Sequence, residues 1–371
     1  MRILLISMNS IHFRRWSDQL RDSGHEVYWF DILDQGYASS MSWMTQITGW
    51  KKGFLIKRGR TTIKKYFPKI YNYLSDKLDT KVETAFAKAL QDIKPDVVHS
   101  FALYTSCLPI LPIMNKEVNI KWIYSSWGSD LFYKGNKPNY HKEVPAVLAR
   151  VDYLFTDCLR DYHIAKNGGF SGRFLGVVPG GGGFESHIDK YYVKNSSFIV
   201  KGYEDALGRC INVLKALDVI ARKHTDISII IFGASKKVTE YLNRNTGRDY
   251  EVKVFGKVSN SEVIDLMLQS KFYIGNSISD GLPNTLLESI FCDCIPIQSN
   301  PGGATEEIIK DTINGFIISN PEDVNAIANS IEMALLSNPS SILMENKEIK
   351  KAYERNEIQA KVLAIYNSLA V

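Results

Sequence analysis

The sequence lacks several features that would place it in common classes of protein. No apolar run approaches the roughly 20 residues of a membrane-spanning helix, so no span is expected. No G-x-G-x-x-G pattern follows the first expected strand at residues 2–7, which argues against a dinucleotide-binding fold of the dehydrogenase kind. No D-x-D pair of acids stands out as a metal ligand, so we expect neither a resident metal nor a cofactor.

Cysteine is scarce. The chain has five, an odd number, and they are scattered along the sequence: Cys107, Cys158, Cys210, Cys292 and Cys294. This usage fits reduced thiols in a cytoplasm better than a disulfide framework. Cys292 and Cys294 have no second pair of ligands nearby, so a zinc site is not expected. The apolar start of the chain is too short for a signal peptide, which also predicts a cytoplasmic location.

Acidic residues are absent from residues 35–75, where basic and aromatic residues are interleaved. The basic ones are Lys51, Lys52, Lys57, Arg58, Arg60, Lys64, Lys65 and Lys69. Together with the aromatic rings of residues 43–69 they suit an anionic membrane surface or a phosphorylated lipid, which predicts a peripheral protein on the inner face of the membrane. The alternative is that the rings pack on the first domain and the lysines are solvated. Nothing else in the sequence supports nucleic-acid binding.

The composition and the alternation of strand-like and helix-like apolar patterns predict an α/β protein of two domains. The chain has 371 residues, 45% of them hydrophobic and 23% charged, with a net charge of +5. Buried-strand patterns alternate with helical ones, beginning with a helix over about residues 13–23, which predicts two Rossmann-like parallel-sheet domains facing a cleft. Four consecutive glycines at 180–183 cannot lie inside a strand or helix, so we place the boundary between 1–183 and 184–356.

The stretch 277–291 gives the most specific indication of a ligand-binding site. A strand over residues 271–275 leads into a loop and then a helix, with an Asn or Thr expected to cap the helix. The loop and helix start comprise Asp280, Gly281, Leu282, Pro283, Asn284 and Thr285. Free amides at the helix start suit a phosphate, and the carboxylates of Asp280 and Glu288 suit hydroxyl groups, which predicts a nucleotide-sugar pocket. The alternative is that the two acids are simply solvated.

This stretch resembles the E-x7-E region of family 4 retaining glycosyltransferases of the GT-B fold. The resemblance rests on Asp280-x7-Glu288, on the Gly-Leu-Pro turn between them, and on the later Pro296 and Pro301-Gly-Gly303. It implies that Asp280 meets the transferred sugar, the amides of 281–285 meet sugar and phosphate, and Glu288 meets the ribose. Asp280 stands where the family has Glu, so its reach is one methylene shorter. The resemblance also implies that the last helix, about 357–371, joins the first domain.

The same resemblance implies how the diphosphate is held. The family has a Gly-Arg after the first strand of this domain and a Lys six residues later. Here Gly202 matches the glycine, Tyr203 stands at the Arg position and Arg209 at the Lys position, while Lys201 is the candidate for the missing charge. The alternative is that Lys201 and Arg209 are surface residues. Two further glycines end strands where backbone can approach the donor, at Gly233 and Gly256.

In the first domain, the resemblance implies a histidine near the acceptor, and Trp127 stands at that position. Asp130 is the nearest ionisable group and is predicted either to take the acceptor proton or to cap the next turn. His12 follows the first strand and His99 ends a later one, so both are predicted to touch the acceptor. The alternatives are a surface histidine at His12 and a filled polar slot at His99.

The sequence therefore predicts a metal-independent, retaining glycosyltransferase of polysaccharide biosynthesis. Residues 184–356 would bind a nucleoside diphosphate sugar, and residues 1–183 with 357–371 would hold a glycan, lipid-linked or polysaccharide acceptor. Asp280, Asp130 and Arg209 are the predicted catalytic residues. One alternative is a sugar-nucleotide epimerase, which needs no acceptor. The other is a donor-binding or scaffolding subunit of a transferase complex with weak activity, because Trp127 and Tyr203 replace expected residues.

Overall fold

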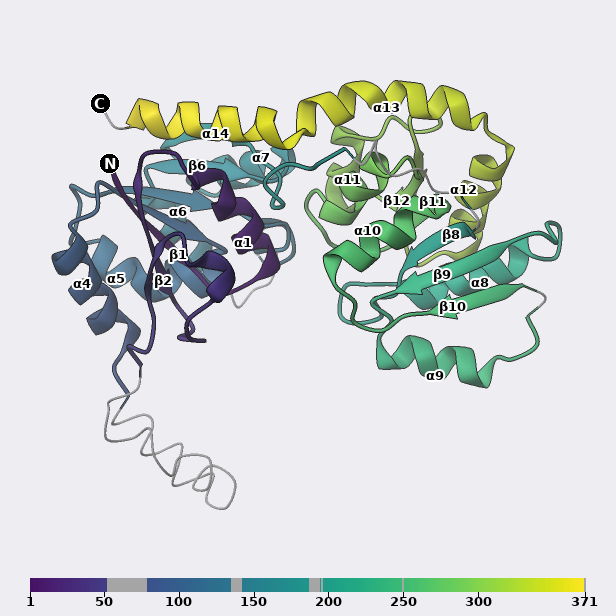
Figure 1. Ribbon diagram of the computed structural model, residues 1–371, viewed down its shortest axis with the longest axis horizontal. Helices are drawn as coiled ribbons and strands as arrows, with labels where there is room; N and C mark the ends of the chain where they lie inside the picture. The colour runs from purple at the N-terminus through teal and green to yellow at the C-terminus, as the bar shows by residue number, and fades with distance from the viewer. Residues whose placement is uncertain (52–78, 135–141, 187–193, 195, 249, 370–371) are drawn as a thin grey trace, which may run out of the picture. The chain divides into compact units, whose positions relative to one another are not determined.

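The computed structural model describes residues 1–51, 79–134, 142–186, 194, 196–248 and 250–369. The chain divides into two compact units, the first comprising 1–157, 162–182 and 361–371 and the second 158–161 and 183–360. Each unit is built on its own sheet of parallel strands flanked by helices (Figure 1). The predicted α/β class with two parallel-sheet domains is confirmed.

The first unit contains a seven-stranded sheet with the order β3-β2-β1-β4-β5-β6-β7. Its strands are β1 (Arg2–Ser7), β2 (Glu26–Asp31), β3 (Thr45–Ile47), β4 (Val97–Phe101), β5 (Lys121–Ser125), β6 (Tyr153–Thr156) and β7 (Arg173–Val177). β2 and β3 lie on one side of β1 and the later strands on the other, so the order reverses between β1 and β4. Side chains that follow β1 and β4 therefore emerge at the switch point of this sheet.

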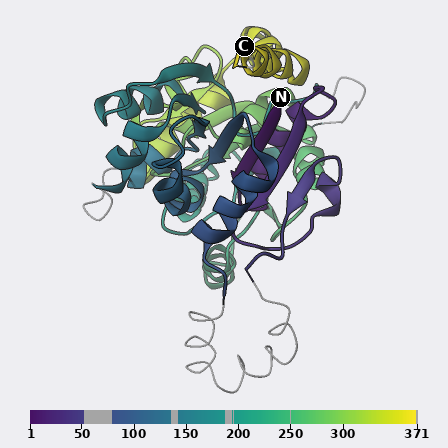
Figure 2. The same cartoon turned by 90° about the vertical axis from the view of Figure 1, so that its left-hand side faces the viewer.

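Helices cover both faces of this sheet (Figure 2). α4 (Val82–Ile93), α5 (Leu111–Met114) and α6 (Glu143–Arg150) share one core cluster with residues of β1, β4 and β5. α1 (Ile11–Ser17) and the part of α14 (Arg355–Leu369) that belongs to this unit contact the other face at His99. α7 (Leu159–Asn167) precedes β7. The prediction of a helix over 13–23 is wrong in its bounds, because α1 begins earlier and continues only as a 3₁₀ turn at Asp18–Leu20.

The second unit has a six-stranded sheet with the order β10-β9-β8-β11-β12-β13. Its strands are β8 (Ser196–Lys201), β9 (Ser228–Phe232), β10 (Glu251–Val254), β11 (Ser270–Gly275), β12 (Ile295–Ser299) and β13 (Phe316–Ile318). Its helices are α8 (Cys210–Ile220), α9 (Lys236–Arg244), α10 (Asn260–Leu268), α11 (Asn284–Phe291), α12 (Val324–Leu336) and α13 (Pro339–Tyr353). Alternate residues of β8 face opposite sides: Phe198 and Val200 pack with α8 and α12, and Ile199 packs with α10 and α11.

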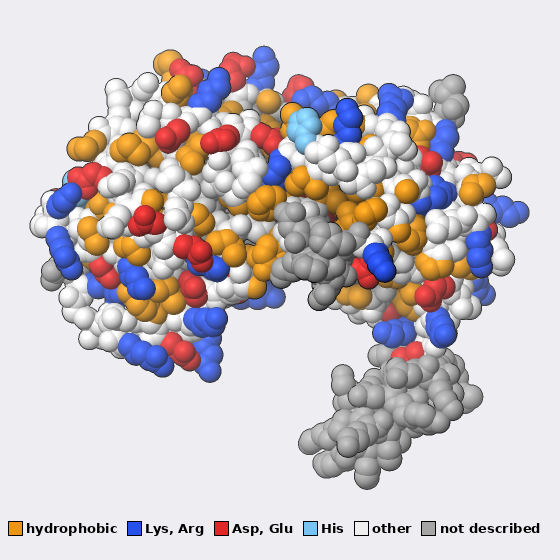
Figure 3. Space-filling model, turned by 180° about the vertical axis from the view of Figure 1, so that it is seen from behind, with side chains coloured by type: hydrophobic (Ala, Val, Ile, Leu, Met, Phe, Trp, Pro, Cys, Tyr) orange, Lys and Arg blue, Asp and Glu red, His pale blue; other side chains and the backbone are white. Residues whose placement is uncertain are grey.

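The segment predicted to contact a membrane, residues 43–69, is described only up to residue 51; its remainder lies outside the described residues. In the described part, the Trp50 indole stacks on Phe30 at 5.3 Å and donates a hydrogen bond of 2.9 Å to the carbonyl oxygen of Asp31. The Arg21 guanidinium lies over the Trp43 ring. These two rings contact the first unit, and the rest of the predicted segment stays a prediction. On the face shown in Figure 3, basic and acidic side chains are interspersed, and no described helix is long and apolar enough to cross a membrane.

Tyr366 closes the core of the first unit from the last helix. It is fully buried, and its hydroxyl lies 2.5 Å from Nδ1 of His99, whose Nε2 lies 2.8 Å from the Ser125 hydroxyl. Burial lowers the pKa of His99 well below its usual value, so the ring is neutral at pH 7. Both of its nitrogens are paired, as a buried neutral imidazole requires.

Replacing Tyr366 by alanine is expected to lower the free energy of unfolding by about 3–5 kcal/mol, because a buried ring is lost and His99 loses a partner. Tyr366→Phe removes only the hydrogen bond and should cost about 1–3 kcal/mol. Urea unfolding followed by circular dichroism measures both, with exposed Tyr37→Ala as the control. A Tyr366→Ala variant as stable as Tyr37→Ala would contradict this account.

The stability of the protein is also expected to depend on pH through His99. Because burial lowers the pKa of His99 in the folded protein, the free energy of unfolding should be highest above pH 6.5, the pKa of histidine in the unfolded chain, and should fall as the pH drops below it.

Candidate functional site

The candidate site lies at the carboxyl ends of β8 and β11. Strand order in the second unit reverses between these neighbours, and ligands of open parallel sheets bind in the crevice outside such a switch point. The two loops that leave the strands are joined by backbone hydrogen bonds, from Arg209 N to Asn276 O at 3.0 Å and from Ile278 N to Leu207 O at 2.9 Å. The loops therefore form one joint rim at the edge of the sheet.

Lys201 and Asp280 meet at this rim. Nζ of Lys201 lies 3.7 Å from Oδ2 of Asp280, and the two side chains are 21% and 32% exposed. The same ammonium lies 5.0 Å from the centre of the Tyr203 ring. Although Lys201 lies two residues before Tyr203, the position that the resemblance assigns to arginine, its long side chain brings its charge to the predicted sugar-binding acid. The pair remains accessible, so both groups can contact a ligand.

The loop after Asp280 is packed against the sheet. Gly281, Leu282 and Pro283 are buried, and α11 begins at Asn284, where the sequence predicted it. The predicted Asn or Thr cap is wrong: Pro283 occupies the cap position and no side chain caps the helix. The Thr285 hydroxyl instead pairs at 2.8 Å with the hydroxyl of Tyr273 on β11, whose pKa is raised by burial. The first turn of α11 is thus fastened to the strand that precedes it.

Glu288 lies one turn into α11 and is only 3% exposed. Its Oε1 accepts a hydrogen bond of 2.9 Å from Nδ2 of Asn260, the first residue of α10. The alternative of two solvated acids is therefore wrong for Glu288. Asn260 is a contributor that the sequence did not reveal, because it lies 28 positions away and its only signal is an ordinary helix start.

The predicted glycines differ in their surroundings. A Cβ on Gly202 would lie 2.7 Å from Cα of Ala234, and one on Gly233 would lie 2.7 Å from Cε1 of Tyr203. Gly233 also has a φ of +64°, in the left-handed region. A Cβ on Gly256 would meet nothing within 4 Å, so no steric requirement for glycine exists there. Close approach is therefore a property of Gly202, which lies against Ala234, and of Gly233, which lies against the Tyr203 ring.

Arg209 lies directly before α8 and pairs with groups of its own unit. Its Nε lies 3.1 Å from Oε1 of Glu322 while Nη1 donates to the carbonyl oxygens of Gly208 and Asp205 at 2.9 and 3.4 Å. The structure thus brings Lys201, rather than Arg209, into an ion pair with Asp280. Glu322 is 63% exposed, so its hold on Arg209 is weak.

The candidate acceptor residues lie in the first unit and fall into two groups. His12 is exposed, and its ring lies 6.1 Å from the half-buried Trp127 ring, so these two share a surface beside the switch point of the first sheet. His99 is fully buried and fills the polar slot described above, which does not suit contact with an acceptor. Asp130 is 5% exposed, and its Oδ2 accepts from Leu103 N at 2.9 Å and from the Tyr124 hydroxyl at 3.2 Å. These contacts tie the Asp130 carboxylate to the helical turn that begins at Leu103 and to β5, which is a structural role.

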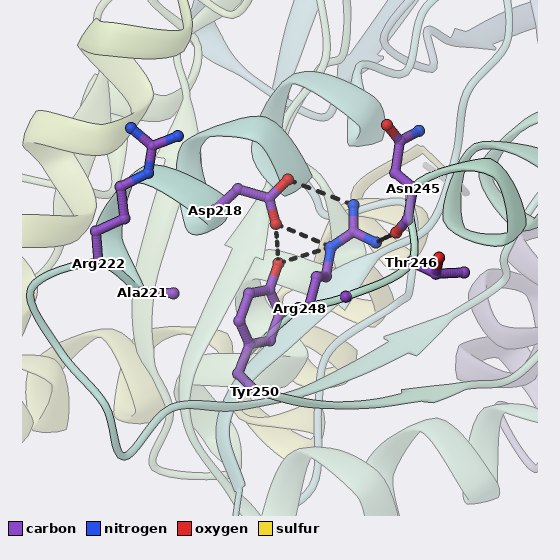
Figure 4. Close-up of a pocket in the computed structure, with 8 residues that line it drawn as sticks. Asp218, Ala221, Arg222, Asn245, Thr246, Arg248 and Tyr250 are labelled. Carbon is purple, nitrogen blue, oxygen red and sulfur yellow. Dashed lines mark hydrogen bonds and ion pairs between the residues drawn. The ribbon is translucent and has the colours of Figure 1, made fainter.

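A cavity of about 290 Å³ lies elsewhere in the second unit (Figure 4). It is lined by Asp218, Ala221, Arg222, Asn245, Thr246, Gly247, Arg248 and Tyr250. Its polar groups largely satisfy one another: Asp218 accepts from Arg248 Nε at 2.8 Å and from the Tyr250 hydroxyl at 2.5 Å. None of the residues predicted from the sequence for donor, catalysis or acceptor lines it. We therefore regard it as a structural cluster between α8 and β10.

Comparison with known proteins identifies residues 209–355 as a match to the family "Glycosyl transferases group 1". The chain is 27% identical over 229 residues to the capsular polysaccharide biosynthesis glycosyltransferase CapH of Staphylococcus aureus, covering 58% of this chain and 62% of that protein. It is 24% identical over 275 residues to the GalNAc-α-(1→4)-GalNAc-α-(1→3)-diNAcBac-PP-undecaprenol α-1,4-N-acetyl-D-galactosaminyltransferase of Campylobacter jejuni, covering 71% of this chain and 72% of that protein.

Among solved structures, Anabaena HepE in complex with UDP-glucose superposes with a TM-score of 0.70 at 12% identity, over 100% of this chain and 99% of that one. This likeness and the two parallel sheets establish the GT-B fold. The stretch that matches the family lies within the second unit. The chain spans 62% of the length of CapH.

Lys201→Ala is expected to weaken the binding of a nucleoside diphosphate roughly tenfold to a hundredfold, because a charge-assisted hydrogen bond contributes about 1.5–3 kcal/mol. Isothermal titration with UDP, ADP and GDP measures the change. Lys223→Ala is the matched control, since that lysine is 65% exposed just after α8 ends. Equal affinity of the Lys201→Ala and Lys223→Ala proteins for whichever nucleotide binds would refute the assignment of Lys201.

Gly233→Ala is expected to lower the free energy of unfolding by about 1–2 kcal/mol, because it places a Cβ in the left-handed region and against Tyr203. Adding Tyr203→Ala should restore the stability that is lost through the clash with the ring. A double-mutant cycle in urea separates this loss from the loss due to the left-handed backbone conformation. Gly256→Ala serves as the control, since its Cβ meets open space. A zero coupling energy would show that the Tyr203 ring does not confine Gly233.

Proposed function

We propose that this protein is a glycosyltransferase that binds a nucleoside diphosphate sugar on its second unit and transfers the sugar to a glycan or lipid-linked acceptor. The observation that carries the proposal is the contact of Lys201 with Asp280 at the switch point of the second sheet. It joins a cation suited to a leaving diphosphate with an acid suited to sugar hydroxyls. The group 1 domain match and the two named relatives support the same class of reaction.

In this proposal the charge on the leaving diphosphate is stabilised by side chains. An ammonium group has three donors, so Lys201 can keep one contact with Asp280 while donating to a phosphate oxygen. Negative charge grows on the leaving group as the bond to the sugar breaks, and a fixed cation lowers the barrier most when it faces that charge. Arg209 is the second cation in the proposal, since its weak pair with exposed Glu322 can be exchanged for a phosphate.

The two acids have separate roles in the proposal. Asp280 accepts hydrogen bonds from hydroxyl groups of the transferred sugar, and buried Glu288, oriented by Asn260, accepts them from the ribose. The sugar is transferred with retention of configuration and without a metal ion. No side chain is assigned as the base, because the leaving phosphate can receive the proton of the acceptor hydroxyl as that hydroxyl attacks. These roles follow the resemblance of the 277–291 stretch and are part of the proposal.

The acceptor is proposed to be a glycan carried on a lipid diphosphate at the cytoplasmic face of a membrane. The names of the two relatives refer to capsular polysaccharide and to an undecaprenol diphosphate glycan, which supports this choice. The basic and aromatic composition of residues 43–69 is also typical of a segment that binds anionic lipid. Exposed His12 and its neighbour Trp127 are the proposed contacts to the acceptor glycan.

A two-stage experiment tests this function. A thermal-shift panel of UDP-, ADP- and GDP-sugars should show one base and one sugar that raise the melting temperature most, by mass action. That donor is then incubated with an undecaprenyl diphosphate-linked glycan and, separately, alone. An elongated glycan is the expected product. An altered sugar nucleotide formed without acceptor would indicate an epimerase instead, and binding without turnover over a broad acceptor panel would indicate a scaffold subunit.

A further inference from the structure

We infer that Arg160 is a positioning residue for the donor site, an inference that rests on the proposed function of Asp280. Nη1 of Arg160 donates to the carbonyl oxygen of Asp280 at 2.9 Å and to that of Pro301 at 2.6 Å. Asp280 lies in the loop after β11, and Pro301 lies in the turn after the neighbouring strand β12. A single guanidinium therefore holds together two loops of the second unit at its carboxyl edge.

The charge of Arg160 is already balanced within the protein. Its side chain is 9% exposed and forms a salt bridge of 2.7 Å with Asp161, which is fully buried. Nε and Nη2 both donate to Oδ1 of Asp161. Four of its five N–H donors are thus used on carbonyl and carboxylate oxygens, which leaves little capacity for a phosphate. Arg160 consequently acts on the site through the backbone that it holds and not by contact with the donor.

The segment that carries Arg160 is itself anchored beside the second loop. The backbone N–H groups of Leu159 and Arg160 donate to the Glu307 carboxylate at 2.6 and 2.8 Å. Glu307 belongs to the short helical turn Thr305–Glu307, a few residues after Pro301. Both the main chain and the side chain of Arg160 are therefore tied to the loop after β12, while the guanidinium reaches across to the loop after β11.

This arrangement fixes Asp280 from two directions. Arg160 holds its carbonyl oxygen, and Lys201 lies 3.7 Å from its carboxylate. The acid is Asp, whose side chain is one methylene shorter than Glu, so a shift of the main chain cannot be absorbed by an extra rotatable bond. Misplacement of a reacting or orienting group by about 1 Å costs roughly a hundredfold in rate. The guanidinium clamp thus sets where the short carboxylate meets the sugar.

The chain offers a matched control in Arg150. Its guanidinium likewise donates to carbonyl oxygens, those of Met114, Glu117 and Ile120, and it pairs with Asp152 at 3.2 Å. Its side chain is 12% exposed, close to the value for Arg160. It belongs to the first unit, so its loss should cost stability without changing the loops after β11 and β12.

The decisive experiment compares Arg160→Ala and Arg160→Lys with Arg150→Ala. Arg160→Lys is included because it keeps the charge opposite Asp161 and so protects folding, although one ammonium cannot reproduce the planar fork. For the best UDP-, ADP- or GDP-sugar of the panel, both Arg160 variants should lose about tenfold to a hundredfold in kcat. They should also discriminate less between that donor and its sugar C4 epimer, while affinity for the free nucleoside diphosphate changes less than about threefold. Arg150→Ala should change only the melting temperature.

Hydrogen exchange separates failure of this inference from failure of the proposed function. Amides of residues 276–283 and 300–305 should exchange at least about tenfold faster in both Arg160 variants than in Arg150→Ala, whether or not a donor is found. Unchanged exchange in these loops overturns the positioning role. Wild-type kcat and sugar selectivity in Arg160→Lys overturn it as well. A wild-type protein that turns over no donor of the panel overturns the proposed function, and the exchange data then still decide whether Arg160 holds the loops.

Discussion

Parallel strand pairing is the constraint on which the rest of the second unit depends. Because every neighbouring pair is parallel, all carboxyl ends of the six strands meet at one edge, and the reversal between β8 and β11 separates two loops there. Residues 201 and 280, far apart in the chain, become neighbours for this reason. The sheet thus brings opposite charges together at its edge, while apolar side chains of its central strands fill the core on both faces.

The charged groups around this edge differ in how firmly they are held. Arg160 and Asp161 are buried and mutually satisfied, and Glu288 is buried against an amide. Lys201 and Asp280 are partly exposed, and Glu322 is mostly exposed. A binding site requires both kinds of group. Buried, paired groups keep the geometry of the site, whereas the contacts of partly exposed groups can be replaced by contacts with a ligand at little cost in free energy.

The sequence predicted the two parallel-sheet domains, because buried parallel strands leave continuous apolar runs and loops leave glycine and proline. It did not predict the short edge strand β3. It located the start of α11 but not its cap, since Pro283 fixes the backbone where a polar side chain was expected. It did not foresee that Arg209 turns to Glu322 or that Arg160 reaches Asp280. Those contacts span 113 and 120 positions, and no local pattern encodes which distant carbonyl or carboxylate a long side chain will find.

The burial of Tyr366 in the first unit has a consequence for synthesis on the ribosome. Most of that unit emerges early, but the ring that fills the slot beside His99 belongs to residues 361–369 and emerges only after the whole second unit. During translation the nascent first unit therefore carries an apolar cavity and an imidazole without its phenol partner. The first unit is therefore completed only after residues 361–369 have been synthesised.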